Sequence, residues 1–269
     1  PGAGKIKEIQ YGERRRIEKI EIEISDEEVY EKSDSFKLNE INELSSEKIL
    51  SKLIDGCLMP FIRQRPYNKI ADPKIPPRDI FISGWNTAPL SVDLDLALRG
   101  RRSQFQTGVS ILNKITKGNV HLSYHENSVS ESLIDLNNVI SHTVQGPHPA
   151  GNVGIHIHHV APLGPNDHVW TINAQDVARI GSFFLTGELD TSLIITVGGS
   201  SVLNSCHIKS RIGAQVSPYL VNNIKEGENR IISGDVLTGK KIDSNDFLGF
   251  YDSSISVISE GGSREFIGM

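Results

Sequence analysis

The amino-acid sequence predicts an α/β protein in which a largely parallel sheet, layered between helices, is followed by a smaller mixed β domain. Between about residues 46 and 197, short apolar strands alternate with segments of helical length and periodicity, a spacing typical of parallel three-layer sheets. From about Thr191 onward, strands become short, glycines become frequent, and one short helix is predicted. That second pattern is typical of a small domain of the β-grasp kind.

Size and composition are those of an ordinary soluble globular protein. A chain of 269 residues can bury a real core, and its apolar share is 38% and its charged share 23%. The net charge of −5 argues against a nucleic-acid partner, and no apolar run approaches the length of a transmembrane helix. Cys57 and Cys206 lie too far apart for an iron–sulfur or zinc-ribbon motif within the chain, and they fit a reducing compartment. Because the first residue is Pro1 rather than Met, we expect a fragment of a longer protein.

The segment Gly4–Ile24 predicts a β-hairpin, because two alternating apolar–polar stretches flank a turn at Tyr11–Glu13. One hairpin alone is marginally stable in water, so we expect its missing partners in a small β domain upstream. The acidic stretch Ser25–Asn42 that follows is linker-like. The arginine clusters at 14–16 and at 99–102 are expected to be solvated faces.

Four helices and five further strands are predicted from periodicity and capping residues. The helix Ser46–Asp55 is expected to have Ser46 as its cap and to end at Gly56. Its apolar stripe consists of Ile49, Leu50, Leu53 and Ile54. The other predicted helices are Arg101–Lys117 with Gly118 as its stop, Ala174–Leu185, and Pro218–Ile224 with Ser217 as its cap. The predicted strands are Asp79–Ser83, Asn119–Tyr124, Val139–Val144, Val169–Ile172 and Leu193–Val197.

The stretch Gly146–Val160 has the densest run of unusual residues, and it closely follows a predicted strand. Two glycines and two prolines fix a turn, and apolar residues broken by histidines make a candidate helix beyond it. A strand, a Gly/Pro turn and a helix form the usual ligand-facing corner of an open α/β sheet. The candidate ligand-corner residues are Gly146, His148, Gly151 and His156.

Three interpretations of this corner stay open. Exposed amides at the helix N-terminus, with His148 as a further donor, could bind a ligand. His156 could share a metal ion with His159 on a helix face or with His158 on a strand face. No Glu lies between these histidines as in the zinc-protease motif, and we assign no metal. The favoured interpretation is a tightly packed crossover whose glycines let helix and strand approach.

Four motifs, kept in order along the whole chain, resemble those of the A subunits of sodium-translocating NADH:quinone oxidoreductases. They are Pro1–Ile6 before the hairpin, Ile62–Lys69, Gly146–Gly151 with His156–His158, and Arg230–Gly239. The resemblance implies four parts. Residues 1–25 are the remnant hairpin of a lipoyl-like β domain, 26–190 a Rossmann-like α/β domain, 191–262 a β-grasp domain of the SLBB-like kind, and 263–269 the start of a truncated C-terminal region.

This family is in turn similar to the flavin-binding subunits of respiratory complex I and of a sodium-pumping ferredoxin complex. Those subunits carry a Rossmann-like FMN domain ahead of a β-grasp domain. Where they have a glycine-rich loop, this chain has Leu58–Arg65, and its bulky side chains fill the space through which a backbone would approach a phosphate. Where they have an acidic run, this chain has Asn86–Pro89. We therefore expect no FMN and no other redox cofactor on this chain.

The resemblance implies a peripheral protein of a respiratory complex, at the cytoplasmic face of the bacterial inner membrane. The complex would oxidise NADH, reduce quinone to quinol and pump sodium ions, and the expected partners are quinone and the other subunits, including membrane-embedded ones. A quinone needs an apolar slot and a few hydrogen-bond donors. The candidate quinone-binding residues are Phe61, Ile62, Arg63, Arg65, Tyr67 and Lys69. Two alternatives stay open: Arg63 and Arg65 dock a neighbouring subunit, or the chain is a free-standing nucleotide- or flavin-binding oxidoreductase domain.

Overall fold

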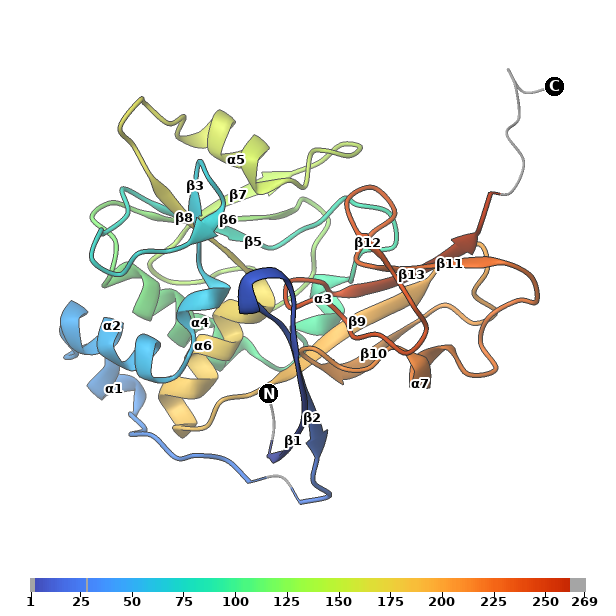
Figure 1. Cartoon of the computed structure of the whole chain (residues 1–269). Helices are drawn as coiled ribbons and strands as arrows, with labels where there is room; N and C mark the ends of the chain where they lie inside the picture. The colour runs from blue at the N-terminus through green and yellow to red at the C-terminus, as the bar shows by residue number, and fades with distance from the viewer. Residues whose placement is uncertain (1–2, 28, 262–269) are drawn as a thin grey trace.

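The computed structural model describes residues 3–27 and 29–261, which form a hairpin and two sheets (Figure 1). A six-stranded sheet with helices on both faces occupies the middle of the chain, and a five-stranded sheet follows it. The segment 263–269, expected to begin a further C-terminal region, lies outside the described residues. Within the part of the chain that is described, no helix has both the length and the apolar character to cross a membrane.

The six-stranded sheet is largely parallel, as the alternation of strands and helices predicts. Its strand order is β4-β3-β8-β5-β6-β7; β8, β5, β6 and β7 run parallel, and β3 and β4 form an antiparallel edge. The strands are β3 (Arg63–Arg65), β4 (Lys69–Ile70), β5 (Ile80–Ser83), β6 (Val120–His125), β7 (Ile140–Val144) and β8 (Val169–Asn173). The four predicted strands of this region match β5 to β8. Strands β3 and β4 were not predicted, because they are very short and β3 pairs with a strand far along the chain.

Helices cover both faces of this sheet because alternate residues of each strand point to opposite sides. Ile80 and Ile82 of β5 join the main apolar core, whereas Phe81 packs with Ile157 and Val169 in a second cluster. The helices over the main core are α2 (Ser46–Asp55), α4 (Arg102–Asn113) and α6 (Ala174–Thr186), and α5 (Val153–Val160) covers the second cluster (Figure 1). The sheet is therefore the middle layer of three, as predicted.

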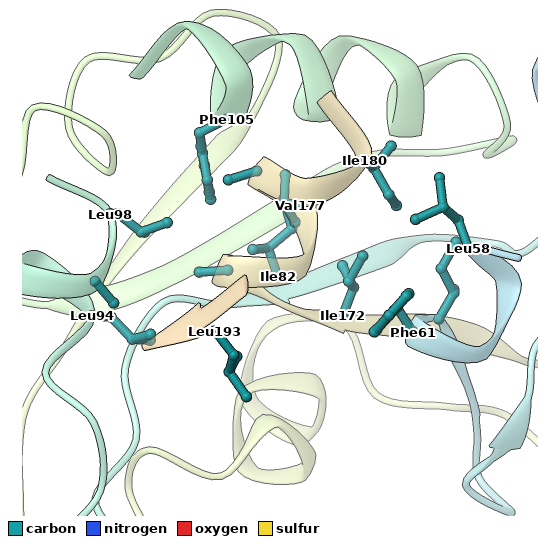
Figure 2. Packing of buried hydrophobic residues seen from close by; sticks show 14 of the residues in the cluster. Leu58, Phe61, Ile82, Leu94, Leu98, Phe105, Ile172, Val177, Ile180 and Leu193 are labelled. Atoms are coloured by element: carbon teal, nitrogen blue, oxygen red, sulfur yellow. The ribbon is translucent and has the colours of Figure 1, made fainter. Parts of the chain in front are cut away.

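Helices α4 and α6 pack closely against each other, and two glycines permit the close approach. A Cβ atom at Gly181 of α6 would overlap the carbonyl oxygen of Gln104, and one at Gly108 of α4 would overlap that of Val177. Figure 2 shows Phe105 of α4 and Val177 of α6 meeting in the core between these helices and the sheet. The two helices therefore form one packed layer.

Helix α2 has the predicted range, but Ser45 caps it, not Ser46. The Ser45 hydroxyl accepts a hydrogen bond from a first-turn amide at 3.3 Å, while the Ser46 hydroxyl donates to the carbonyl of Lys114 at 2.7 Å. Gly56 ends the helix as predicted. Ile54, expected in the buried stripe, is 50% exposed, so the buried stripe of α2 is narrower than predicted.

Helix α4 and the basic cluster beside it also differ from expectation. The helix ends at Asn113, and Lys114 is its C-cap in place of Gly118, because the chain leaves the helix to bury Ile115. Arg101 pairs with Asp190 at 2.9 Å. Arg102 donates hydrogen bonds to three backbone carbonyls of the loop before β7. These arginines therefore tie elements together and do not form a solvated face, whereas the cluster at 14–16 is exposed as predicted.

The five-stranded sheet is small and mixed, as predicted for this region. Its order is β10-β9-β13-β11-β12, with β9 and β13 parallel and the other neighbours antiparallel. The strands are β9 (Ser192–Gly198), β10 (Cys206–Arg211), β11 (Asn229–Ser233), β12 (Lys240–Ile242) and β13 (Ser254–Ser259). Its helix α7 (Ser217–Leu220) is a single turn with Val216 at the N-cap, shorter than the predicted Pro218–Ile224, because Val221 has extended backbone with ψ 124°.

One apolar core joins the two sheets. Leu193, Ile195 and Val197 of β9 belong to the same buried cluster as Ile82 and Ile172 of the six-stranded sheet. Separation of the two sheets would therefore expose part of the main core.

The remaining short helices, which were not predicted, are η1 (Glu13–Arg15), α1 (Leu38–Ile41), η2 (Met59–Phe61) and α3 (Leu94–Ala97).

The N-terminal hairpin forms as predicted, from β1 (Gly4–Tyr11) and β2 (Ile17–Ile24). Its register sets Ile6 opposite Ile22 and Ile9 opposite Ile20, so the isoleucines gather on one face. That face is open to solvent, with Ile6 63% exposed and Ile20 48% exposed. The assignment of this hairpin to a lipoyl-like domain stays a prediction.

We expect amide hydrogen exchange in β1 and β2 to be much faster than in β5, because the hairpin can open without exposing the core. The measurement is exchange followed by mass spectrometry at neutral pH, with peptides from the buried strand β13 as a second reference. Protection of the hairpin equal to that of β5 would show that it has a further partner.

Candidate functional site

A cleft of about 160 Å³ lies between the two sheets, at the carboxyl ends of two neighbouring parallel strands. Ser83 at the end of β5 and Asn173 at the end of β8 border it. From β5 the chain proceeds to β6 on one side, and β8 lies on the other side, so the strand order changes direction at this point. Open α/β sheets bind ligands at such a switch point. Side chains that also border the cleft include Phe61, Arg63, Arg179, Phe250 and Tyr251.

An aromatic cluster closes one side of the cleft. The Phe61 ring, placed by η2, stacks on Phe250 with 5.0 Å between ring centroids, and Phe250 meets Tyr251 edge-on at 4.9 Å. The guanidinium of Arg63 lies 4.6 Å from the Tyr251 ring centroid and donates a 2.7 Å hydrogen bond to the Tyr251 hydroxyl. That hydroxyl donates in turn to the carbonyl of Pro60 at 3.1 Å. The cluster therefore clamps the segment before β3 to the loop before β13.

Arg179 of α6 is a buried cation at the back of this cluster. It is 1% exposed, and its guanidinium lies 4.7 Å from the Phe61 ring centroid. It donates hydrogen bonds of 2.8 Å to the carbonyls of Asp190 and Ser192, and it pairs with Asp176. Burial lowers its pKa to about 10, so the side chain stays charged at neutral pH. Its partners hold the start of β9 against α6.

The structure divides the six predicted quinone-binding residues into separate groups. Phe61 and Arg63 border the cleft. Ile62 is fully buried in the core, so it has no surface for a ligand ring. Tyr67 is 84% exposed and Lys69 is exposed, and both stand at the β3–β4 tip outside the cleft lining.

Arg65, the remaining predicted residue, lies at the end of β3 and does not border the cleft. Burial, with the neighbouring charge of Arg63 as a smaller cause, lowers its pKa, and its Nε atom is buried without a hydrogen-bond partner. Sequence reasoning missed Arg179, Phe250 and Tyr251. The adjacent aromatics Phe250 and Tyr251 carry no local sign of their contact, because Tyr251 lies 188 residues from Arg63.

The predicted ligand corner is closed by its own contacts. The Thr87 hydroxyl accepts a 3.0 Å hydrogen bond from the amide of Gly151 and lies 3.1 Å from Nδ1 of His148. His156 is 4% exposed, with Nε2 2.7 Å from the carbonyl of Ala150. A Cβ atom at Gly151 would lie 2.6 Å from the amide nitrogen of Thr87, so glycine permits this approach.

The corner therefore agrees best with the packed-crossover interpretation. Gly146, His148, Gly151 and His156 do not border the cleft, although Val153 at the start of α5 does. Across residues 3–27 and 29–261, no group of three or more His, Cys, Asp or Glu side chains is placed to hold a metal ion.

A histidine pair, with His121 buried and His142 half-buried, lies beneath α5. His121 stacks on Phe81 with 4.7 Å between ring centroids, and its Nδ1 lies 3.0 Å from Nε2 of His142. Its other ring nitrogen is 3.8 Å from a carboxylate oxygen of Asp79. Burial lowers the pKa of His121, of His142 and of the nearby His156. The folded protein therefore resists protonation here.

We expect the free energy of unfolding to fall as the pH drops from 7.5 to 5.5. These histidines have folded-state pKa values below the unfolded value of about 6.5, so the unfolded chain binds more protons and stability is complete only above that value. The measurement is urea unfolding across this window, with His142→Gln as the variant that should flatten the slope. A stability independent of pH over the window would contradict the assignment.

We expect Arg179→Met to lower the free energy of unfolding by about 3 kcal/mol, because it leaves Asp176 and two carbonyls without their buried partner. The matched control is Arg99→Met on the exposed surface, which should change stability by less than about 0.5 kcal/mol. Denaturant titrations of both variants test this, and equal stabilities would remove Arg179 as a structural anchor.

The fold is shared with an NAD⁺-reducing [NiFe]-hydrogenase chain in its air-oxidised state. That comparison has a TM-score of 0.54 and 12% identity, and it covers 84% of this chain and 49% of the other. At this identity the likeness establishes the α/β architecture alone. The chain therefore consists of an open α/β domain joined to a small mixed sheet, with a cleft at the switch point.

Two family models match the chain: the NqrA second alpha/beta domain over residues 44–189 and the NQRA C-terminal domain over residues 194–244. The chain belongs to the NqrA family, which confirms the resemblance drawn from its motifs. It is 35% identical over 269 residues to the A subunit of the Na(+)-translocating NADH-quinone reductase of Yersinia pestis bv. Antiqua (strain Angola). It is 34% identical over 268 residues to that of Saccharophagus degradans. The chain spans 60% of the length of each of these relatives.

Proposed function

We propose that this chain is part of the A subunit of a sodium-translocating NADH–quinone reductase. Relatives that match the whole chain carry that name, and the two family models cover most of both sheets. In this proposal the complex oxidises NADH, reduces quinone and moves sodium ions, and the subunit lies peripherally on the cytoplasmic face of the membrane. The proposed domains are the hairpin at 1–25, the α/β domain at 26–190 and the β-grasp domain at 191–262.

Within that complex, the cleft at the switch point binds the quinone ring. The observation that carries this proposal is a ring-sized space bordered by the aromatic cluster. The cleft holds about 160 Å³, and an apolar cavity of about 150 Å³ accepts one benzene ring. Phe250 and Tyr251 offer aromatic surface, while Arg63 and Asn173 offer hydrogen-bond donors for quinone carbonyls.

The residues around the cleft also support the proposal that this subunit carries no flavin of its own. A flavin or nucleotide phosphate needs a backbone that it can approach and free donors. The stretch Leu58–Arg65 instead packs inward, with Leu58 and Ile62 fully buried. The guanidinium of Arg179 donates to two carbonyls and pairs with Asp176, so its strongest interactions are already made. This argues against the alternative of a free-standing flavin-binding domain.

The β3–β4 tip suits the second role predicted for this segment, contact with a neighbouring subunit. Tyr67 is 84% exposed, and Ile70 beside it is 48% exposed. Arg63 donates to the carbonyl and the side-chain oxygen of Asn68, which holds the tip in place. A fixed tip with an exposed tyrosine ring presents a residue type that is enriched where proteins bind their partners.

We expect Phe250→Ala and Arg63→Met each to weaken quinone binding by up to about tenfold, because an aromatic contact or a hydrogen bond contributes about 1 kcal/mol. Tyr67→Ala is the matched control on the same surface and should leave quinone affinity unchanged. The measurement is calorimetric titration of the full-length subunit with a short-chain quinone, and with FMN in parallel, after circular dichroism has confirmed folding.

Three results would each overturn one of these assignments. Unchanged quinone affinity in folded Phe250→Ala and Arg63→Met would remove the cleft as the ring site. Stoichiometric, tight binding of FMN would establish the flavoprotein alternative. If Tyr67→Ala also assembles normally with the other subunits on a native gel, the docking role of the tip is wrong.

A further inference from the structure

The stretch Leu136–Asn166, which includes the predicted ligand corner, carries no Asp, Glu, Lys or Arg residue, whereas 23% of the whole chain is charged. It comprises the end of the loop before β7, β7 itself, the Gly/Pro turn, and α5 with the loop that follows it. Burial does not account for this composition, because only Gly151, His156 and Ile157 of the stretch are buried. A long uncharged stretch therefore lies on the surface of the protein.

Strand β7 is an unprotected edge of the six-stranded sheet. It pairs with β6 on one side, and no described strand lies on its other side (Figure 1). The outer edges of the two sheets, over the residues that the structure describes, are β4, β7, β10 and β12. Three of these edges carry cations, which are Lys69 in β4, Lys209 and Arg211 in β10, and Lys240 and Lys241 in β12. Charged side chains keep other chains from adding to an edge strand, and β7 has none.

The free edge of β7 is accessible. Ile140 is 44% exposed, and Ser141 and Thr143 are also exposed. Besides the pairing with β6, the carbonyl of Val144 accepts a 3.1 Å hydrogen bond from the amide of Glu126. Glu126 directly follows β6, so this bond continues the same pairing. The outward-facing amides and carbonyls of β7 are thus left for another polypeptide backbone.

The register of the sheet shows which side chains an added strand would meet. Phe81, which packs on α5, is opposite His121, and His121 is opposite Ile140. Ile140 and His142 therefore lie on the face of the sheet that α5 covers, while Thr143 lies on the other face. Both faces of a new strand beside β7 would meet uncharged side chains.

We infer that an extended segment of another subunit adds to β7 as a further strand of the six-stranded sheet. The inference rests on the proposed function, in which the chain is one subunit of a complex. A row of backbone amides and carbonyls is complementary to another polypeptide backbone, which fixes the class of partner as a protein segment in strand conformation. Depletion of charged residues marks the centre of a protein interface, so the partner strand presents apolar or hydroxyl side chains to β7.

The test assembles the full-length subunit with the other subunits of the proposed complex and compares three variants. Thr143→Lys places a charge on β7, and Thr143→Val leaves the same position uncharged. Cys206→Lys adds the same charge to the exposed start of β10, an edge that already carries cations. Because the added strand would desolvate the lysine, we expect Thr143→Lys to weaken assembly about tenfold. The other two variants should assemble like the native protein on a native gel, after circular dichroism has confirmed folding.

Hydrogen exchange supplies a second measurement that needs no variant. The amides of residues 140–144 should exchange about tenfold more slowly, or slower still, in the assembled complex than in the free full-length subunit. Those of residues 206–211 should be unchanged. Equal exchange of the β7 amides in both states, or native-like assembly of Thr143→Lys, would overturn the inference while the proposed function stands.

Two further outcomes identify a different occupant or a different function. If the β7 amides are already protected in the free subunit, the rest of its own chain or a second copy covers the edge, and the inference is wrong. Analytical ultracentrifugation distinguishes these two occupants. If the native subunit does not assemble with the other subunits, the proposed function is wrong and the inference falls with it.

Discussion

The buried guanidinium of Arg179 is the interaction on which the arrangement of the two sheets depends. A charge taken out of water is costly unless its donors are satisfied, so the carbonyls of Asp190 and Ser192 must stay where they are. Those carbonyls lie at the entry to β9, and their position sets where the second sheet begins. The loop with Phe250 consequently comes to rest on Phe61, which also packs on Arg179. The position of the cleft thus depends on the hydrogen bonds of the buried Arg179 guanidinium.

Most of the fold could be predicted from local periodicity in the sequence. The strands from β5 to β9 were predictable because each is either an apolar run or an alternating apolar–polar stretch of strand length. Helix ends were less predictable. The hydroxyl of Ser45 caps α2, although the neighbouring Ser46 has the same side chain, and α4 ends at Lys114 although Gly118 is the better stop signal in the sequence. The edge strands β3 and β4 escaped prediction because their pairing depends on β8, which no local pattern reveals.

The sequence predicted only those residues of the site that lie early in the chain. Phe61 and Arg63 stood out in an unusual segment, but their partners Phe250 and Tyr251 belong to a loop that tertiary packing alone brings near. The opposite holds for the corner near Gly151, where unusual residues signalled a function and the structure shows a hydrogen bond to Thr87. Dense glycine, proline and histidine there reflect close backbone packing. Residues that look distinctive in a sequence can therefore mark a steric demand as readily as a ligand.

The single core shared by the two sheets has a consequence for how a ligand enters. Because Leu193 and Ile195 of β9 are buried with residues of the other sheet, swinging the two sheets apart would expose part of the shared core to water. Tyr251 is 56% exposed and Phe250 is 39% exposed, so these rings can turn without opening that core, once Tyr251 has released its hydrogen bonds to Arg63 and Pro60. Access to the cleft would then depend on rotation of these side chains rather than on slower domain opening. If the cleft is a ligand site as proposed, a ligand could therefore enter it and leave it without separation of the two sheets.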